Sequence, residues 1–207
     1  MTTDQASREA VREAVHATEP RFRKARTAVE AALTGRARSR EAASWQVLAA
    51  KEQLCESLDR AVLPGTDANG AQSAMNDVQE RWAAMPELPA AQEKKMTARR
   101  DAAIVALTDP SRSTTHAAAI AANAGGRREM LLELELVLGL DSPAALQSQR
   151  LALQVKQLKD RFKSAVSVTA ETAGERLLAW CAMAGVCDAA DRPRVERIFA
   201  KCAKAAS

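Results

Sequence analysis

Apolar residues recur along this chain at steps of three and four, the spacing that places side chains on one face of an α-helix. One stretch, residues 132–136, alternates Leu with Glu and would also fit a strand. Leu and Glu are strong helix formers and poor strand formers, so the helical interpretation is preferred there. The pattern predicts helices over residues 4–18, 20–33, 39–62, 71–84, 89–107, 116–139, 143–165, 171–184 and 191–205.

Glycine and proline residues mark the expected ends of these helices. Pro20 suits the first turn of a new helix, and Gly35 suits a left-handed stop. Gly125-Gly126 is expected to interrupt or kink the helix over 116–139. The clearest boundary is 139–143, where Gly, a capping Asp or Ser, and Pro follow one another. We therefore expect an all-α fold of roughly eight or nine helices, packed as antiparallel hairpins or a bundle, with an elongated coiled-coil-like hairpin as one form of it.

A joint is predicted near the middle of the chain. Residues 109–115 contain Pro110 and a cluster of Ser and Thr, a composition typical of a connecting segment. The predicted division is an N-terminal helical module over 1–108, the joint over 109–115, and a C-terminal helical domain over 116–207.

Residues 80–89, Glu-Arg-Trp-Ala-Ala-Met-Pro-Glu-Leu-Pro, are the most informative short segment. Trp82 lies near the predicted end of one helix, Pro86 stops that helix, and Pro89 begins the next. This pattern indicates a helical turn built around a packed aromatic, and it contains no reactive group.

The charge is mildly basic overall, and the excess is local. Lys and Arg number 30 against 26 Asp and Glu, which gives a net charge of +4. Between residues 21 and 40, seven cations are opposed by Glu30 alone; they are Arg21, Arg23, Lys24, Arg26, Arg36, Arg38 and Arg40. A second basic stretch spans 150–163. Two interpretations of the 21–40 segment stay open: a solvated helix face opposite Phe22 and Val29, or an electrostatic surface that binds a polyanion or an acidic partner.

The sequence offers no recognisable catalytic, cofactor or metal site. The four cysteines include no Cys-x-x-Cys pair and have no nearby His, so each is expected to be a core residue in a reducing compartment, with Cys187 the most exposed. His16 and His116 are both expected at the surface. Glu133 and Glu135 are expected on a solvated face, and Gly125-Gly126-Arg127-Arg128 is expected to kink the helix and not to bind an anion. We expect no catalytic residues, no cofactor, no metal, and no enzyme activity.

The N-terminal residues have neither a basic nor an apolar signal region, and no apolar run approaches the length that crosses a bilayer. A soluble, cytoplasmic protein without a membrane partner is expected.

Three places in the chain resemble the bacterial family known as domain of unknown function 349. They are Lys51-Glu52-Gln53-Leu54-Cys55-Glu56, then 79–82 with 85–89 at the Trp turn, and 134–136 with 140–143 and Arg150. The last place resembles the region that follows the module in proteobacterial members. The resemblance covers about residues 45 to 165 and implies a degenerate or terminal copy of the module, since Pro86-Glu87 stands where the family has Gly-Pro and the helix after Pro89 lacks the family's aromatics. It brings no catalytic residue with it.

The sequence therefore favours a non-enzymatic helical scaffold or adaptor that binds another macromolecule, with a protein partner expected. The alternative is a nucleic-acid-associated protein that uses the basic segment 21–40. The oligomeric state is not predicted.

Overall fold

The computed structural model describes residues 3–163 and 172–205, and within these ranges the chain is helical with no strand, which confirms the all-α prediction. Leu132–Leu136 are part of a helix, as their helix propensity predicts. The elements are α1 (Thr3–Val62), α2 (Ala68–Ala84), α3 (Ala90–Thr108), α4 (Pro110–Val137), the 3-10 helix η1 (Ala144–Leu146), α5 (Gln147–Lys163), α6 (Ala173–Ala182) and α7 (Arg192–Ala205).

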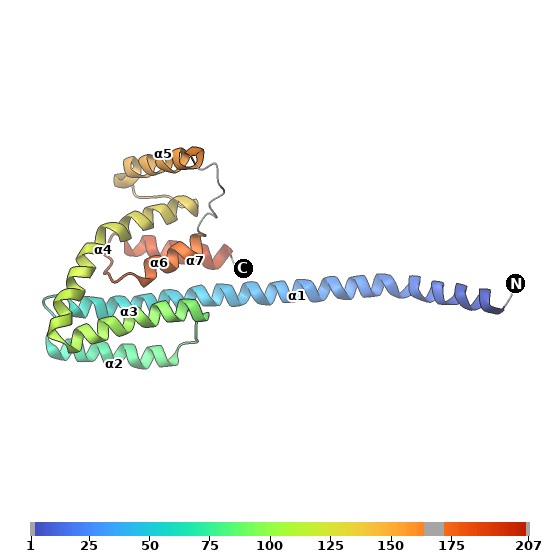
Figure 1. Cartoon of the computed structure of the whole chain (residues 1–207), viewed down its shortest axis with the longest axis horizontal. Coiled ribbons are helices and arrows are strands. Elements are labelled where there is room, and N and C mark those ends of the chain that lie inside the picture. Colours follow the sequence, from blue (N-terminus) through green and yellow to red (C-terminus); the bar gives the residue numbers. More distant parts are fainter. Residues whose placement is uncertain (1–2, 164–171, 206–207) are drawn as a thin grey trace.

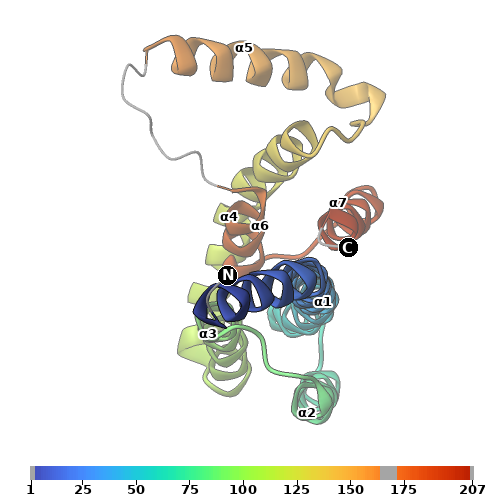
Figure 2. The ribbon, with the colours of Figure 1, turned by 90° about the vertical axis from the view of Figure 1, so that its right-hand side faces the viewer.

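The helices form a body from which α1 projects (Figure 1). The last turns of α1 pack against α2, α3, α4 and α7, and α6 packs against α3 and α4. Figure 2 shows α5 standing at the edge of the body, beyond the end of α4. One hydrophobic core contains Leu54, Leu58, Met96, Leu134 and Ile198, so residues from both halves of the sequence share it.

The prediction of separate helices over 4–18, 20–33 and 39–62 is wrong, because α1 runs unbroken for 60 residues through Pro20 and Gly35. Gly35 does not adopt the left-handed conformation of a helix stop; only Gly65 and Gly139 have a positive φ in the described residues. A glycine inside a helix costs about 1 kcal/mol relative to alanine, and the flanking Ala, Arg and Glu are strong helix formers. Pro20 removes one helical hydrogen bond, but the freed carbonyl lies on an exposed helix where water can hydrate it.

The segment over 109–115 is also different from the predicted joint. Asp109 alone forms the turn, its carboxylate accepts a hydrogen bond from the backbone N–H of Ser111 at 2.9 Å, and Pro110 begins α4. A capping Asp followed by Pro at the first helical position is a helix start as much as a loop signal. Residues 110–115 are therefore the first turns of α4.

The end of α4 confirms the Gly139 boundary. Gly139 has φ 66°, its N–H donates to the carbonyl of Leu136 at 3.3 Å, and the N–H of Leu140 donates to the carbonyl of Glu135 at 2.8 Å. These two bonds form a Schellman motif, which satisfies the carbonyls at the end of the helix. The predicted interruption at Gly125-Gly126 is absent, because α4 is helical through both residues.

The Trp turn is built as the sequence predicts, with charged groups added around it. Trp82 is 8% exposed, and two cations lie over its ring, Lys51 at 4.6 Å and Arg100 at 4.7 Å from the ring centroid. Lys51 also donates to both carboxylate oxygens of Glu93, at 2.7 and 2.6 Å, and Glu93 accepts from the backbone N–H of Leu88 at 2.9 Å. The ammonium of Lys51 therefore joins α1 to the turn between α2 and α3.

Candidate interaction surface and buried ion network

Residues 3–41 of α1, called the arm from here on, contain the predicted basic segment. Every side chain described between residues 7 and 41 is exposed, including all seven cations of 21–40. At 1.5 Å per residue the arm is about 60 Å long. The structure thus brings the seven cations together on one exposed helix.

Two of these cations have carboxylate partners on the same helix. Arg23 lies 3.3 Å from Glu19, and Arg26 donates to Glu30 at 2.8 Å. Both pairs are exposed, and exposed pairs of this kind contribute only about 0.3–0.5 kcal/mol each. Within the described residues, the other five form no ion pair; they are Arg21, Lys24, Arg36, Arg38 and Arg40.

The apolar face of the arm is exposed as well. Phe22 is 71% exposed, Val29 58% and Leu33 59%. Within the described residues, nothing covers these three side chains of the apolar face that the sequence places opposite the solvated one. A basic surface and an uncovered apolar stripe lie on the same helix.

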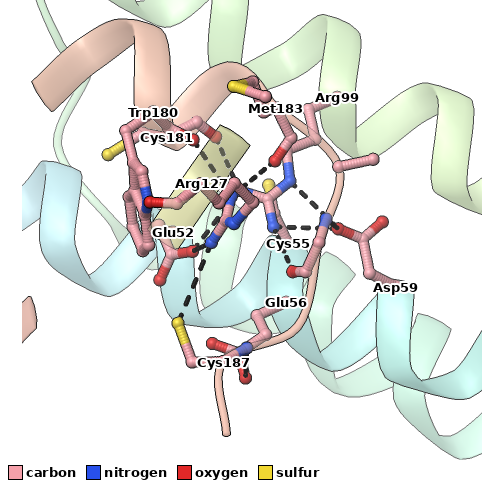
Figure 3. A network of polar contacts seen from close by, with 12 residues as sticks. Glu52, Cys55, Glu56, Asp59, Arg99, Arg127, Trp180, Cys181, Met183 and Cys187 are labelled. Atoms are coloured by element: carbon pink, nitrogen blue, oxygen red, sulfur yellow. Dashed lines mark hydrogen bonds and ion pairs between the residues drawn. The ribbon is translucent and has the colours of Figure 1, made fainter. Parts of the chain in front are cut away.

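The body contains a second group of charges, which is buried (Figure 3). Glu52, Glu56 and Asp59 follow one another along α1 at steps of four and three, so all three face the interior, and each is at most 2% exposed. We call these carboxylates and the arginines that pair with them the ion network.

Arg99 of α3 occupies the centre of the ion network. Its guanidinium donates to Asp59 Oδ2 at 3.1 and 2.8 Å, and to Glu52 Oε1 at 3.4 Å. It also donates to the carbonyls of Cys181 and Gly185, at 2.6 and 3.0 Å. Arg99 therefore joins α1 to the end of α6 and to the connection between α6 and α7.

Arg127 of α4 holds the same connection from another side. It donates to Glu52 Oε1 at 3.1 Å and to the carbonyls of Trp180 and Met183 at 3.0 and 2.6 Å. Its guanidinium lies 3.8 Å from the centroid of the Trp180 ring, a cation–π contact. Arg127, which the sequence placed in a segment expected to kink the helix, is buried and binds backbone carbonyls.

The α6–α7 connection also donates to the carboxylates. The N–H of Gly185 donates to Asp59 at 2.8 Å, and the N–H of Cys187 donates to Glu56 at 3.2 Å. The arginines of the ion network donate to backbone carbonyls of this non-helical segment, and the carboxylates accept from its N–H groups. The buried charges therefore supply hydrogen-bond partners to backbone groups that would otherwise be buried without any.

The environment favours the ionised form of Asp59. Burial raises the pKa of this carboxyl, but the hydrogen bond from His116, the charge of Arg99 and the N–H of Gly185 outweigh burial and lower it below 3.8. His116 Nε2 lies 2.7 Å from Asp59 Oδ1. The prediction of a surface His116 is thus wrong, whereas His16 is exposed as expected.

The environment of the cysteine thiols, in contrast to that of Asp59, disfavours their ionised form. All four cysteines are free and buried, which confirms their assignment as core residues; Cys187 is the most exposed of them, as expected, but only at 8%. Burial raises the pKa of Cys55 to about 12 and that of Cys187 to about 11. Thiols with such pKa values are protonated at neutral pH and are weak nucleophiles and metal ligands.

Glu135 is a further residue whose environment was predicted incorrectly. It is 0% exposed and accepts two hydrogen bonds from Arg194, at 2.8 and 2.9 Å, and one from Ser142 at 2.7 Å. The sequence did contain a signal for it, because Glu135 falls four residues after the core residue Leu131 and one after Leu134.

Unpartnered polar atoms are few. In the ranges 3–163 and 172–205, two buried side-chain oxygens have no hydrogen-bond partner, Glu56 Oε2 and Gln92 Oε1. The same ranges contain no group of three His, Cys, Asp or Glu side chains arranged to hold a metal ion. No helix among these residues combines the length and apolar character needed to cross a membrane.

Fold and surface together define an all-α protein with a body stabilised by buried ion pairs and a projecting basic helix. A family model described as Domain of Unknown Function (DUF349) matches residues 17–91, which confirms the resemblance to that family. The match begins within the arm and includes all seven cations, although the resemblance in the sequence was placed at about 45–165. It ends just after the Trp turn, so the resemblance of 134–150 lies outside it.

Searches of curated proteins and of solved structures each found no match to the chain.

Proposed function

We propose that the chain is a non-enzymatic helical adaptor whose arm binds an acidic surface of another macromolecule, with a protein as the primary partner. The observation that carries this proposal is the exposure of seven cations on a helix that projects about 60 Å from the body. An isolated helix gains little stability without tertiary contacts. A partner would supply the burial and the opposite charge that the arm does not find in its own body.

The absence of enzyme activity is part of this proposal. The ion network uses its arginines to bind backbone carbonyls and carboxylates, an arrangement that stabilises the body. The thiols have raised pKa values, which weakens the case for a cysteine nucleophile. Buried free thiols also support the assignment to a reducing compartment such as the cytoplasm.

The proposal is tested by affinity purification from nuclease-treated extract of cells that make the protein naturally. The test variant changes Arg36, Arg38 and Arg40 to Ala, which removes three exposed charges from the arm. A matched control changes three exposed lysines of the body, Lys94, Lys201 and Lys204, to Ala. The expected result is a stoichiometric acidic protein that the wild type and the control retain and the arm variant loses. Equal recovery by all three chains would contradict the proposal.

The alternative, a nucleic-acid-associated protein, is favoured by one specific observation, the ratio of seven cations to one carboxylate in 21–40. If the arm contacts phosphates, binding to labelled duplex DNA or RNA should weaken steeply with salt. The arm variant should then reduce the slope of log affinity against log salt by about 3, since each lost cation removes about one counterion. No binding at low salt would exclude this alternative.

A further inference from the structure

The uncovered apolar stripe of the arm follows a regular seam. Alternating steps of three and four connect eight positions, which are Val11, Val15, Thr18, Phe22, Ala25, Val29, Ala32 and Arg36. Six of the eight are apolar, over about three and a half heptads, which is the minimum length that favours a coiled coil. Phe22 and Val29, on this seam, are 71% and 58% exposed. Pro20 falls on the opposite side of the helix from the seam.

Charge is distributed unequally along the arm. Residues 3–20 contain four carboxylates and two arginines, a net charge of −2, whereas residues 21–40 have a net charge of +6. Two arms aligned in parallel would place like charges side by side. Two antiparallel arms would place the acidic tip of each beside the basic segment of the other. Arg21, Arg23, Lys24 and Arg26 of the two copies would still meet near the middle of the pair, but Arg36, Arg38 and Arg40 of each copy would lie beside the acidic tip of the other. An antiparallel pair therefore brings fewer like charges together than a parallel pair does.

We infer that the arms of two copies of this chain pair as an antiparallel coiled coil, in which Phe22 of each copy packs against Ala25 of the other. This alignment pairs large residues with small ones in successive layers: Phe22 with Ala25, and Val29 with Thr18. Such alternation lets the two helices approach closely without voids.

The flanking charges select this alignment over its neighbours. It places Glu19 of each copy beside Arg26 of the other. A shift by one heptad in one direction would place Glu19 against Glu19 of the second copy. A shift in the other direction would place Arg26 against Arg26, and a parallel pair would place Arg21 against Arg26. Of these four arrangements, only the inferred alignment gives two opposite-charge contacts.

Arg23, Lys24 and Arg38 lie away from the seam and stay exposed in the pair, so the pair leaves them free to contact the proposed partner, whereas Arg36 is a seam position. The two bodies would lie at opposite ends of a shared rod, about 55 Å apart, since residue 42 of one copy would lie beside residue 5 of the other.

The full chain is tested by light scattering over a concentration series, with small-angle X-ray scattering of the associated form. A dimer with separated bodies is expected, and a monomer at every concentration or a dimer with adjacent bodies would overturn the inference. Val29→Glu should abolish the dimer, whereas Ala31→Glu, on the outward side of the arm, should leave it intact. Circular dichroism verifies that both variants keep their helix content. A dimer that tolerates Val29→Glu would equally overturn the inference.

A charge exchange tests the alignment itself. Glu19→Arg and Arg26→Glu should each weaken dimerisation roughly fivefold, since symmetry turns both flanking contacts into like-charge pairs. The double variant restores opposite charges and should recover most of the affinity. A double variant no tighter than the single ones would contradict this alignment. If the wild-type chain forms the dimer but recovers no acidic protein in the affinity purification, the result would count only against the proposed function.

Discussion

Replacing Arg99 with Met should destabilise the body strongly, although the Met side chain fills most of the volume that the Arg side chain occupies. The guanidinium of Arg99 forms ion pairs with Asp59 and Glu52, and its side chain is 1% exposed. Removing one partner of a buried ion pair costs about 3–5 kcal/mol, because the remaining carboxylate stays buried without its counter-charge. Two backbone carbonyls lose a donor as well, at about 1 kcal/mol each.

These losses overlap, because Glu52 keeps Arg127 and Asp59 keeps His116. We expect a decrease of about 4 kcal/mol in the free energy of unfolding, a large fraction of the 5–15 kcal/mol typical of a protein. Urea unfolding followed by tryptophan fluorescence measures it. The matched control is Arg81→Met, an exposed residue paired with Asp77, which should change stability by less than about 0.5 kcal/mol. A cost below about 1 kcal/mol for Arg99→Met would refute the structural role given to the ion network.

Three further outcomes are expected. Gly185→Ala should destabilise the body by about 1–3 kcal/mol in the same urea assay, because a Cβ there would lie 2.5 Å from Arg127 Cδ; an unchanged midpoint would count against this packing. A thiol reagent at neutral pH should label none of the four cysteines until the chain unfolds, and rapid labelling of native Cys187 would contradict its burial. Because the folded-state pKa of Asp59 is below 3.8, its contribution to stability is present above that pH and is lost as the pH falls through the lower value. Asp59→Asn should therefore flatten the acid limb of a plot of unfolding free energy against pH, and an identical limb would contradict the shift.

Local sequence signals predicted most helices and several of their ends. Gly139 stops α4 as expected, and Trp82 with Pro86 and Pro89 forms the turn that the spacing indicates. Pro20 and Gly35 were misleading, because a breaker only lowers helix stability, and the residues around it decide whether the helix continues.

The ion network could not be predicted, because burial of a charge depends on partners distant in sequence. Glu52 lies 47 residues from Arg99 and 75 from Arg127, so no local pattern relates them. The three carboxylates of the ion network do fall on the apolar side of α1, among Leu48, Leu54 and Leu58. That position in the sequence indicated that they could be buried. The exposure of the basic segment could be predicted from its composition, because charged side chains are mostly exposed. The exposure of the apolar face opposite it could not, because an apolar stripe on a helix usually packs against a core.

The most direct measurement of the central claim is site-specific photo-crosslinking in cells that make this protein. A photoreactive residue at Arg38 samples the arm, and one at Lys94 samples an exposed site on the body. The adaptor account predicts a discrete adduct with another macromolecule from position 38 and none of the same mass from position 94. Adducts from position 94 alone would contradict it.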